Sequence, residues 1–178
     1  YPRLGGRLLQ HVAREHPFSL RAPPRVPPVS AIVPVRGTDR ERALAFVVSA
    51  LRAVGGPASE VLVCEHDELP RLGRRWPEGV RHVFVPAAPG VAFNKSKALN
   101  AGARAARHPL LLLHDADVWP PEDYVLQCAE LMDREGWEAV RPIRFLFLLG
   151  EAESRQVLET ADVRSVRTVA QVQQNNPG

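Results

Sequence analysis

The chain has few cysteines and no long hydrophobic run, and both absences exclude classes of protein. Two cysteines, Cys64 and Cys128, are too few for the disulfide framework of a small secreted domain, and they favour a reducing, cytoplasmic setting. No stretch approaches the roughly 18 apolar residues of a transmembrane helix, and no secretory signal peptide is visible. We therefore expect no transmembrane segment in this chain.

The chain also lacks a basic stripe with interleaved aromatic residues, so we expect no nucleic-acid partner. The net charge of +3 is unevenly spread. Residues 1–30 hold five arginines and a single acidic residue, Glu15, so the remainder of the chain carries about −1. The basic excess therefore lies outside the part of the chain that carries the candidate chemistry.

A length of 178 residues, with 45% hydrophobic and 24% charged residues, suits one globular domain with a real core. Residues 1–21 predict a short amphipathic helix, and the proline-rich residues 22–28 predict a stiff linker. We therefore divide the chain into this N-terminal part (1–28) and a domain of residues 29–178. Because the chain opens at Tyr1 and ends in loop-like residues, we expect a fragment whose domain is incomplete at its C-terminal end.

Strand and helix patterns alternate from residue 29 onward. Strands are expected at 30–35, 60–65, 80–85, 110–114 and 139–143, and helices at 38–54, 94–107, 121–135 and 151–161, with extended structure at 163–172. Thr38 and Glu41 have the spacing of a capping box, and Pro34 should end the first strand. Small residues in the second helix indicate close packing on the sheet. This alternation predicts an α/β fold with a mostly parallel, Rossmann-like sheet flanked by helices.

The most informative segment is the run of four leucines at 110–113 that continues as His-Asp-Ala-Asp. Asp115 and Asp117 should lie at the carboxyl end of a buried strand, where chemistry gathers in open α/β sheets. Two carboxylates at this spacing repel unless a cation or proton lies between them. Mg²⁺ and Mn²⁺ are commonly held by carboxylates together with substrate phosphates. The alternative is a surface turn, because Pro120 and Pro121 follow.

Other strand ends should bring Arg36, Glu65 and Asp67 to the same edge. The helix predicted from Asn94 begins just after a loop, and a helix N-terminus favours anions by about 0.3–1 kcal/mol. Lys95 and Lys97 add positive charge there, unless they form only a solvated helix face. Metal-holding acids that face a basic helix start are what a diphosphate leaving group needs.

Three segments together resemble GT-A glycosyltransferases. They are Val29–Arg36 (VSAIVPVR), Phe93–Gly102 (FNKSKALNAG) and Leu113–Pro120 (LHDADVWP), and they are most similar to family 2 enzymes and to β-galactosyltransferases that use UDP-galactose. The resemblance covers about residues 29–125. It implies a GT-A fold and a metal-dependent transfer of sugar from a UDP-sugar donor to a glycan, peptide or small-molecule acceptor.

The resemblance also implies roles for single residues. The residues that would line the nucleotide-sugar pocket are Pro34, Val35, Arg36, Glu65, Phe93, Lys95, Asp115 and Ala116. Glu65 would contact base or ribose, although family 2 usually has Asp there, and Lys97 and Asn100 would support the phosphate loop. Asp117 would ligate Mn²⁺ or Mg²⁺, with Asp115 contacting the ribose or the metal through water. His114 is more often a packed core residue than a ligand at such a position.

No catalytic base can be named from this sequence. Inverting members of the fold carry a carboxylate base in the later, acceptor-binding half, so we expect the base beyond Gly178. The acids that follow Gly150 match no motif and are interpreted as a solvated helix face; they are Glu151, Glu153, Glu159 and Asp162.

Three other functions stay open at this point. A haloacid-dehalogenase-type phosphatase also uses Asp-x-Asp, but on its first strand and with Thr or Val where Trp119 stands. A sugar-nucleotide pyrophosphorylase would need a glycine-rich loop where Val35–Thr38 lies. A nucleotide-sugar-binding domain without catalysis would bind a UDP-sugar and not turn it over.

Overall fold

The computed structural model describes residues 26–73, 76–142 and 145–174. The predicted N-terminal helix (1–21) and most of the predicted linker lie outside these ranges. Residues 26–28 have no regular secondary structure and lead into the first strand. The division of the chain at residue 28 stays a prediction.

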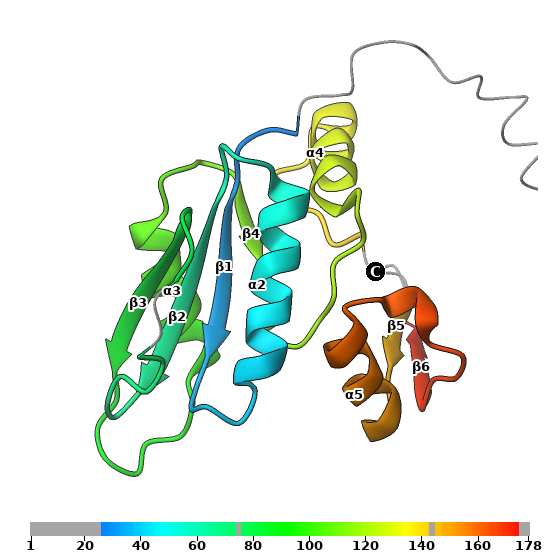
Figure 1. The fold of residues 1–178 in the computed structure, drawn as a ribbon. Coiled ribbons are helices and arrows are strands. Elements are labelled where there is room, and N and C mark those ends of the chain that lie inside the picture. Colours follow the sequence, from blue (N-terminus) through cyan, green and yellow to red (C-terminus); the bar gives the residue numbers. More distant parts are fainter. Residues whose placement is uncertain (1–25, 74–75, 143–144, 175–178) are drawn as a thin grey trace, which may run out of the picture.

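A four-stranded parallel sheet forms the centre of the fold (Figure 1). Its strands are β1 (Ser30–Val35), β2 (Glu60–Asp67), β3 (Val80–Pro86) and β4 (Leu111–Leu113), in the order β3-β2-β1-β4. β1 pairs in parallel with β2 on one side and with β4 on the other. All residues of β1 and β2 are buried, as expected for apolar runs covered on both faces. The predicted α/β fold with a mostly parallel sheet is confirmed.

Two helices cover opposite faces of the sheet, α2 (Glu41–Gly55) in front and α3 (Lys95–Ala105) behind (Figure 1). Alternate residues of β1 enter the two core layers. Val33 packs with Leu44 and Leu51 of α2, whereas Ile32 packs with Ala98 of α3. The strand period of two thus fills both layers from one strand.

The small residues of α3 allow it to lie very close to the sheet, as predicted. A Cβ added at Gly102 would stand 2.3 Å from Cγ2 of Ile32 and 2.7 Å from Sγ of Cys64. Cys64 is a free, fully buried thiol, and burial raises its pKa to about 12 despite the opposing charge of Arg81. It therefore acts as a small hydrophobic residue of this layer.

β1 runs through Pro34, which was expected to end it. Pro34 stays in register with Cys64 of β2. The Ile32 carbonyl oxygen accepts a hydrogen bond from the His114 amide at 3.0 Å, so the even-numbered residues of β1 direct their peptide groups toward β4. β4 ends at Leu113, so no ladder partner stands opposite the missing N–H of Pro34. The predicted strand at 30–35 is therefore confirmed, and the expectation that Pro34 ends it is wrong.

The first helix begins later than the predicted capping box. Arg40 occupies the N-cap of α2, and its side chain makes no capping hydrogen bond. The Glu41 amide donates to the Thr38 carbonyl oxygen at 3.0 Å, so Thr38 closes the turn through its backbone. The predicted capping box of Thr38 and Glu41 is wrong, and the turn brings Arg40 to the carboxyl edge of the sheet. The helix ends as predicted, at Gly56 with φ +73°.

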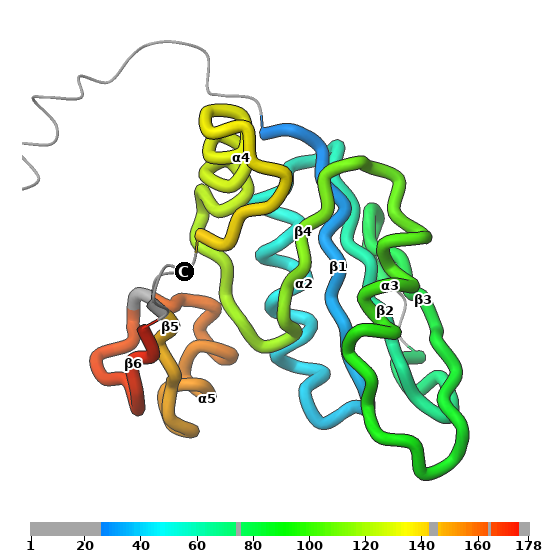
Figure 2. Tube along the Cα trace, turned by 180° about the vertical axis from the view of Figure 1, so that it is seen from behind, coloured from blue at the N-terminus to red at the C-terminus, as the bar shows by residue number. Residues whose placement is uncertain are grey.

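β4 lies at the edge of the sheet nearest α4 (Tyr124–Glu135), as the view from behind shows (Figure 2). The predicted strand at 139–143 is wrong for its described part, because residues 139–142 form no strand. Pro142 lacks a donor, and β1 is the one strand that pairs with β4 among the described residues. The segment therefore has no strand partner.

The next strand, β5 (Phe145–Leu148), pairs antiparallel with β6 (Gln171–Gln174) in a separate two-stranded sheet. Between them lie α5 (Glu151–Thr160), which confirms the predicted helix, and the 3₁₀ helix η1 (Val163–Ser165). The expected extended structure at 163–172 is wrong where η1 forms. This unit lies beside the end of α2 at which that helix begins (Figure 1). Among the described residues, no helix is long and apolar enough to span a membrane.

Candidate functional site

The carboxyl ends of β1, β2 and β4 bring charged side chains to one edge of the sheet, as predicted. Arg36 follows β1, and its Nε lies 3.6 Å from Oδ1 of Asp67 at the end of β2. The amide of Gly37 donates to Oδ2 of Asp67 at 3.2 Å. Asp115 and Asp117 follow β4 at the same edge. The edge therefore combines the basic side chain of Arg36 with three acids, Asp67, Asp115 and Asp117.

Asp115 and Asp117 each form an ion pair with a side chain from a different helix start. Lys95 Nζ contacts Oδ1 of Asp115, and Arg40 Nη1 contacts Oδ2 of Asp117. Lys95 opens α3 and Arg40 precedes α2, so the two cations come from helices on opposite faces of the sheet (Figure 1). The two carboxylate side chains are 48% and 43% exposed. The acid pair is neutralised, as its mutual repulsion requires, yet it stays open to solvent.

The chemistry of these two carboxylates fits a hard divalent cation. Asp115 and Asp117 offer exposed oxygen ligands beside a helix start. Mg²⁺ is usually held by one or two carboxylates, with water and substrate phosphates completing its shell. Nowhere in residues 26–73, 76–142 and 145–174 do three or more His, Cys, Asp or Glu side chains gather to hold a metal. A cation at this site would therefore share its coordination shell with a substrate.

The N-terminus of α3 lies next to the same acids. Asn94 has the extended conformation of an N-cap, and its side-chain oxygen accepts from the Lys97 amide at 2.9 Å. The ion pair with Asp115 fixes the direction of Lys95, and Phe93 is partly exposed just before the helix. Lys97 and Asn100 are exposed on α3, and their supporting role stays a prediction. The predicted basic helix start and the acid pair thus form one site.

Arg36 ties together the loops that follow the first three strands. Its Nη1 donates to the Val91 carbonyl oxygen at 2.6 Å, and its Nη2 lies 3.9 Å from Oε1 of Glu68. The same Glu68 oxygen accepts from the Gly90 amide at 2.9 Å. Arg36 therefore fixes the walls of the edge, and its predicted contact with a nucleotide would be made from within this network.

Asp67 is a residue of the edge to which the sequence analysis gave no role in binding. Burial alone would raise its pKa, but the Glu68 amide, the Arg71 guanidinium, the Gly37 amide and the Arg36 guanidinium together hold the pKa of Asp67 below its usual range. Asp67 is therefore a fixed negative charge between two arginines. The signal available in the sequence was its place two residues after Glu65, on the same face of the strand.

Glu65 is buried and engaged in hydrogen bonds, and its predicted contact with base or ribose stays a prediction. Its side chain is 0% exposed, and its carboxylate accepts from the amides of Arg71 at 2.8 Å and Leu72 at 3.3 Å. His82 Nε2 lies 2.8 Å from its other oxygen. The prediction ended β2 at Glu65, but the strand continues to Asp67, so Glu65 stays inside the sheet. In this arrangement it holds residues 71–72 in place and does not reach the edge.

Three further predicted pocket residues are buried at this edge of the sheet. Pro34 and Val35 are buried at the end of β1, and Ala116 is buried between the two exposed aspartates. Each can shape the floor under a ligand, and none presents a polar side chain to it. The exposed polar groups of the site come from the helix starts and from the two aspartates.

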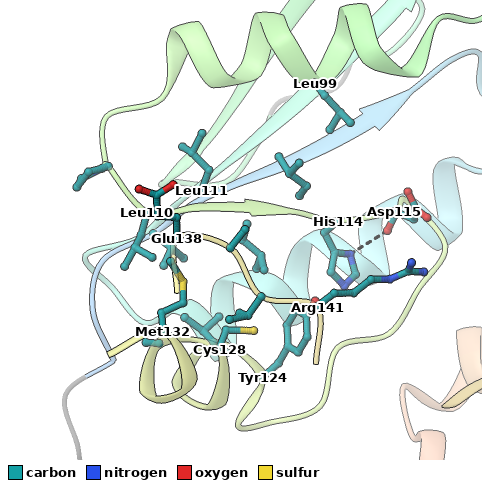
Figure 3. Close-up of a pocket in the computed structure, with 18 of the residues that line it drawn as sticks. Leu99, Leu110, Leu111, His114, Asp115, Tyr124, Cys128, Met132, Glu138 and Arg141 are labelled. Atoms are coloured by element: carbon teal, nitrogen blue, oxygen red, sulfur yellow. Dashed lines mark hydrogen bonds between the residues drawn. The ribbon is translucent and has the colours of Figure 1, made fainter. Parts of the chain in front are cut away.

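Two histidines pack beneath the edge. His114 is buried, and its Nδ1–H donates to the Asp115 carbonyl oxygen at 2.9 Å, as the dashed line in Figure 3 shows. Burial lowers its pKa, although the backbone and charge of Asp115 and the charge of Asp117 oppose that shift. His66 accepts from the Asn94 amide at 3.3 Å through Nδ1. His114 is thus the packed residue that the sequence favoured, and His66 supports the turn before α3.

A groove of about 680 Å³ runs along the open edge of β4. Its walls are the leucines of 110–113, α4, and the segment Glu138–Arg141, with Asp115 at one end (Figure 3). The side chain of Arg141 extends toward that end (Figure 3). The groove is therefore a largely apolar channel that reaches one member of the acid pair, Asp115.

The acids of α5 behave as predicted for a solvated helix face. Glu151 pairs with Arg155 at 2.8 Å, and Glu153 accepts from the Thr168 hydroxyl at 2.7 Å. That hydrogen bond lowers the pKa of Glu153. Both carboxylates are thus engaged in surface contacts of their own unit.

Comparison with known proteins gives one family. The model of the family described as glycosyl transferase family 21 matches residues 6–147. This range contains the whole parallel sheet, both covering helices, Asp115, Asp117 and α4. No curated protein matches the chain.

Proposed function

Because the chain belongs to glycosyl transferase family 21 and is a glycosyltransferase, we propose that it moves a sugar from a UDP-sugar donor with Mg²⁺ or Mn²⁺ held at Asp115 and Asp117. The observation that carries this proposal is the exposed acid pair after β4, which lies between Lys95 and Arg40. The parallel sheet with two covering helices is consistent with a GT-A-like domain. Membership in a transferase family disfavours the hydrolase, the pyrophosphorylase and the binding domain without catalysis.

The acid pair supplies the metal-binding half of the donor site. Asp117 and Asp115 would hold the cation through oxygen ligands, and the half-exposed side chains leave room for phosphate oxygens in the same shell. When bound, a divalent cation neutralises the charge that develops on a departing diphosphate. The two carboxylates would hold that cation at the edge of the sheet.

The start of α3 supplies the second half of the phosphate site. The amides of a first helical turn attract anions, and at α3 the Lys97 amide already donates to Asn94, so the preceding amides and the charge of Lys95 are left for a phosphate. Lys95 already contacts Asp115, so its ammonium group stands beside the proposed cation. The leaving diphosphate would then face positive charge from two sides.

The loops tied by Arg36 supply the nucleoside side of the site. Phe93 offers a partly exposed aromatic face just before α3, and Pro34 and Val35 give a buried floor. Asp67 adds an ionised carboxylate at the end of β2. This set offers an aromatic surface and polar groups for a base and its ribose, which favours a nucleotide over a simple sugar phosphate.

The test is a calorimetric titration of UDP into the 178-residue chain with and without Mn²⁺. The affinity for UDP should rise at least ten-fold with Mn²⁺, whereas the affinity for uridine should change little. GDP and ADP serve as controls for the nucleotide. UDP binding of equal strength without any metal would contradict the proposed metal site. A separate assay of UDP release from UDP-sugars measures whether the chain transfers or hydrolyses the sugar.

A further inference from the structure

The ion pair between Arg40 and Asp117 carries an inference that rests on the proposed donor site and extends it. We propose that Arg40 binds the diphosphate of the donor. In the ligand-free protein its guanidinium neutralises Asp117. With Asp117 engaged in holding the metal, the guanidinium would instead pair with the phosphate oxygens beside it.

The balance of charge supports this exchange. Two carboxylates, Asp115 and Asp117, face two cations, Lys95 and Arg40, so the ligand-free site is neutral. A divalent cation brings two positive charges to the carboxylates, and the two phosphates of a nucleotide-sugar bring two negative charges. If Lys95 and Arg40 transfer to the phosphates, each charge again has a partner. If Arg40 leaves for solvent, one phosphate charge lacks a partner.

The geometry keeps Arg40 within reach of the phosphates. Asp117 would hold the cation through a carboxylate oxygen, and phosphate oxygens completing the same shell would lie beside that carboxylate. The guanidinium that now touches Asp117 therefore needs only a small movement. Both side chains of the pair are exposed, and exposed ion pairs contribute little to stability, so the pair opens readily.

The backbone of Arg40 is held in place, whereas its side chain is exposed and can change direction. The Arg40 carbonyl oxygen accepts from the amide of buried Leu44 at 2.8 Å, which holds its backbone at the start of α2. Its side chain is 67% exposed and takes no part in capping the helix. The planar guanidinium also matches two phosphate oxygens at once.

Arg40 could bind the diphosphate, or it could only compete with the metal for Asp117. The direction in which the affinity for UDP changes when Arg40 is removed distinguishes these two roles. If Arg40 only competes with the cation for Asp117, its removal should leave the affinity for UDP with Mn²⁺ unchanged or increase it. If Arg40 binds the diphosphate, its removal should weaken that affinity. The affinity for Mn²⁺ alone should rise slightly or stay the same, because Asp117 loses a competing cation.

The experiment compares wild type, Arg40→Gln, Arg40→Lys and a matched control, Arg42→Gln, in the 178-residue chain. Arg42 is exposed on the same helix and carries the same charge. Calorimetry measures UDP with Mn²⁺, UMP with Mn²⁺, and Mn²⁺ alone. Arg40→Gln should weaken UDP about ten-fold or more, the equivalent of losing one charge-assisted hydrogen bond. UMP should lose less, Arg40→Lys should lie between, and Arg42→Gln should match wild type.

Each outcome decides the assignment. Equal or tighter binding of UDP by Arg40→Gln would overturn it and leave the proposed function intact. A parallel fall in affinity for Mn²⁺ alone would also overturn it, because Arg40 would then act through the placement of Asp117. If wild type binds UDP with no dependence on Mn²⁺, the proposed function fails first and this inference falls with it. Thermal unfolding of each variant identifies any change that comes from misfolding.

Discussion

Two strands of the sheet end in the same pattern, an acid, one other residue and a second acid. β2 ends in Glu65-His66-Asp67, and β4 is followed by Asp115-Ala116-Asp117. Glu65 and Asp67 are buried, and their partners come mainly from backbone amides and arginines of the surrounding loops. Asp115 and Asp117 are about half exposed and contact one cationic side chain each.

The position of each strand in the sheet explains the difference. β2 lies between β1 and β3 and continues for eight residues, so its acids are enclosed by neighbouring strands and loops. β4 is an edge strand of three residues, and the chain leaves the sheet before Asp115. The first pattern is therefore fixed inside the fold, whereas the second leaves two carboxylates open to solvent, where the proposed function needs them. Spacing alone does not separate these two roles.

The largest expected effect is the loss of stability on removing Glu65. Glu65→Ala leaves the amides of Arg71 and Leu72 and the ring nitrogen of His82 without their buried acceptor. Each orphaned group costs about 1–3 kcal/mol, so the free energy of unfolding should fall by about 3 kcal/mol or more. Urea unfolding of wild type and variant measures the difference.

The matched change at the other strand is Asp115→Ala. Its ion pair with Lys95 is exposed, so the free energy of unfolding should change by less than about 1 kcal/mol. If Glu65→Ala and Asp115→Ala destabilise the protein equally, the acids of β2 and those after β4 do not differ in what they contribute to the fold.

The next effect in size is the loss of metal-dependent binding at Asp117. Asp117→Asn should remove most of the rise in UDP affinity that Mn²⁺ produces, on the order of 10–100-fold, while the melting temperature stays within a few degrees. Calorimetry with and without Mn²⁺ measures it. Glu122→Gln, an exposed acid five residues along, is the control for lost charge. An unchanged response to Mn²⁺ in Asp117→Asn would assign the acid pair to structure alone.

The sequence was sufficient to predict the features that follow from local pattern or from a general rule for parallel sheets. The apolar run of β1, the small residues of α3 and the start of α3 at Asn94 all follow from local pattern. The prediction of charged side chains at one edge followed from the parallel order of the strands. These features depend on residues that lie close in sequence or on a rule that holds for every parallel sheet.

The sequence was insufficient where a partner decides the structure. Residues 139–142 have a strand-like pattern, but β4 gives them no ladder. Pro34 is tolerated because β4 has already ended on the side that its missing N–H would face. The role of Arg40 was hidden because Thr38 and Glu41 match a capping box that the helix does not use. For residues 139–142 and for Pro34 the deciding feature is the extent of β4, a distant strand. For Arg40 it is the residue at which α2 begins.

Lys95, the cationic partner of Asp115, provides a further test of the exposed acid pair. Lys95→Ala should weaken UDP about ten-fold, because a charge-assisted contact is worth about 1.5–3 kcal/mol, and it should weaken uridine far less. Arg104→Ala, which removes an exposed positive charge from the last turn of α3, is the control. Equal losses for uridine and UDP would mean that Lys95 acts through the packing of the helix. Calorimetry with both ligands distinguishes the two results.

The smallest expected effect is a dependence of stability on pH that comes from Asp67. The contacts of this carboxylate with the Glu68 and Gly37 amides and with Arg71 and Arg36 outweigh its burial and hold its pKa below the ordinary value of about 3.9. A depressed pKa in the folded state means that the stabilising contribution is fully present above the unfolded value and is lost as pH falls through the folded value.

Asp67→Asn cannot titrate, so it should be less stable than wild type at pH 6, and the gap should narrow as pH falls from 4 toward 2. Urea unfolding at each pH measures the gap. The pKa of Glu60 is also lowered, because hydrogen bonds from Arg107, Ser30 and Arg81 outweigh its burial, so stability in both proteins should fall in acid. The difference between the two curves isolates Asp67. A gap that stays constant across this range would mean that Asp67 acts as a neutral hydrogen-bond acceptor, and that the walls of the site depend on its shape and not on its charge.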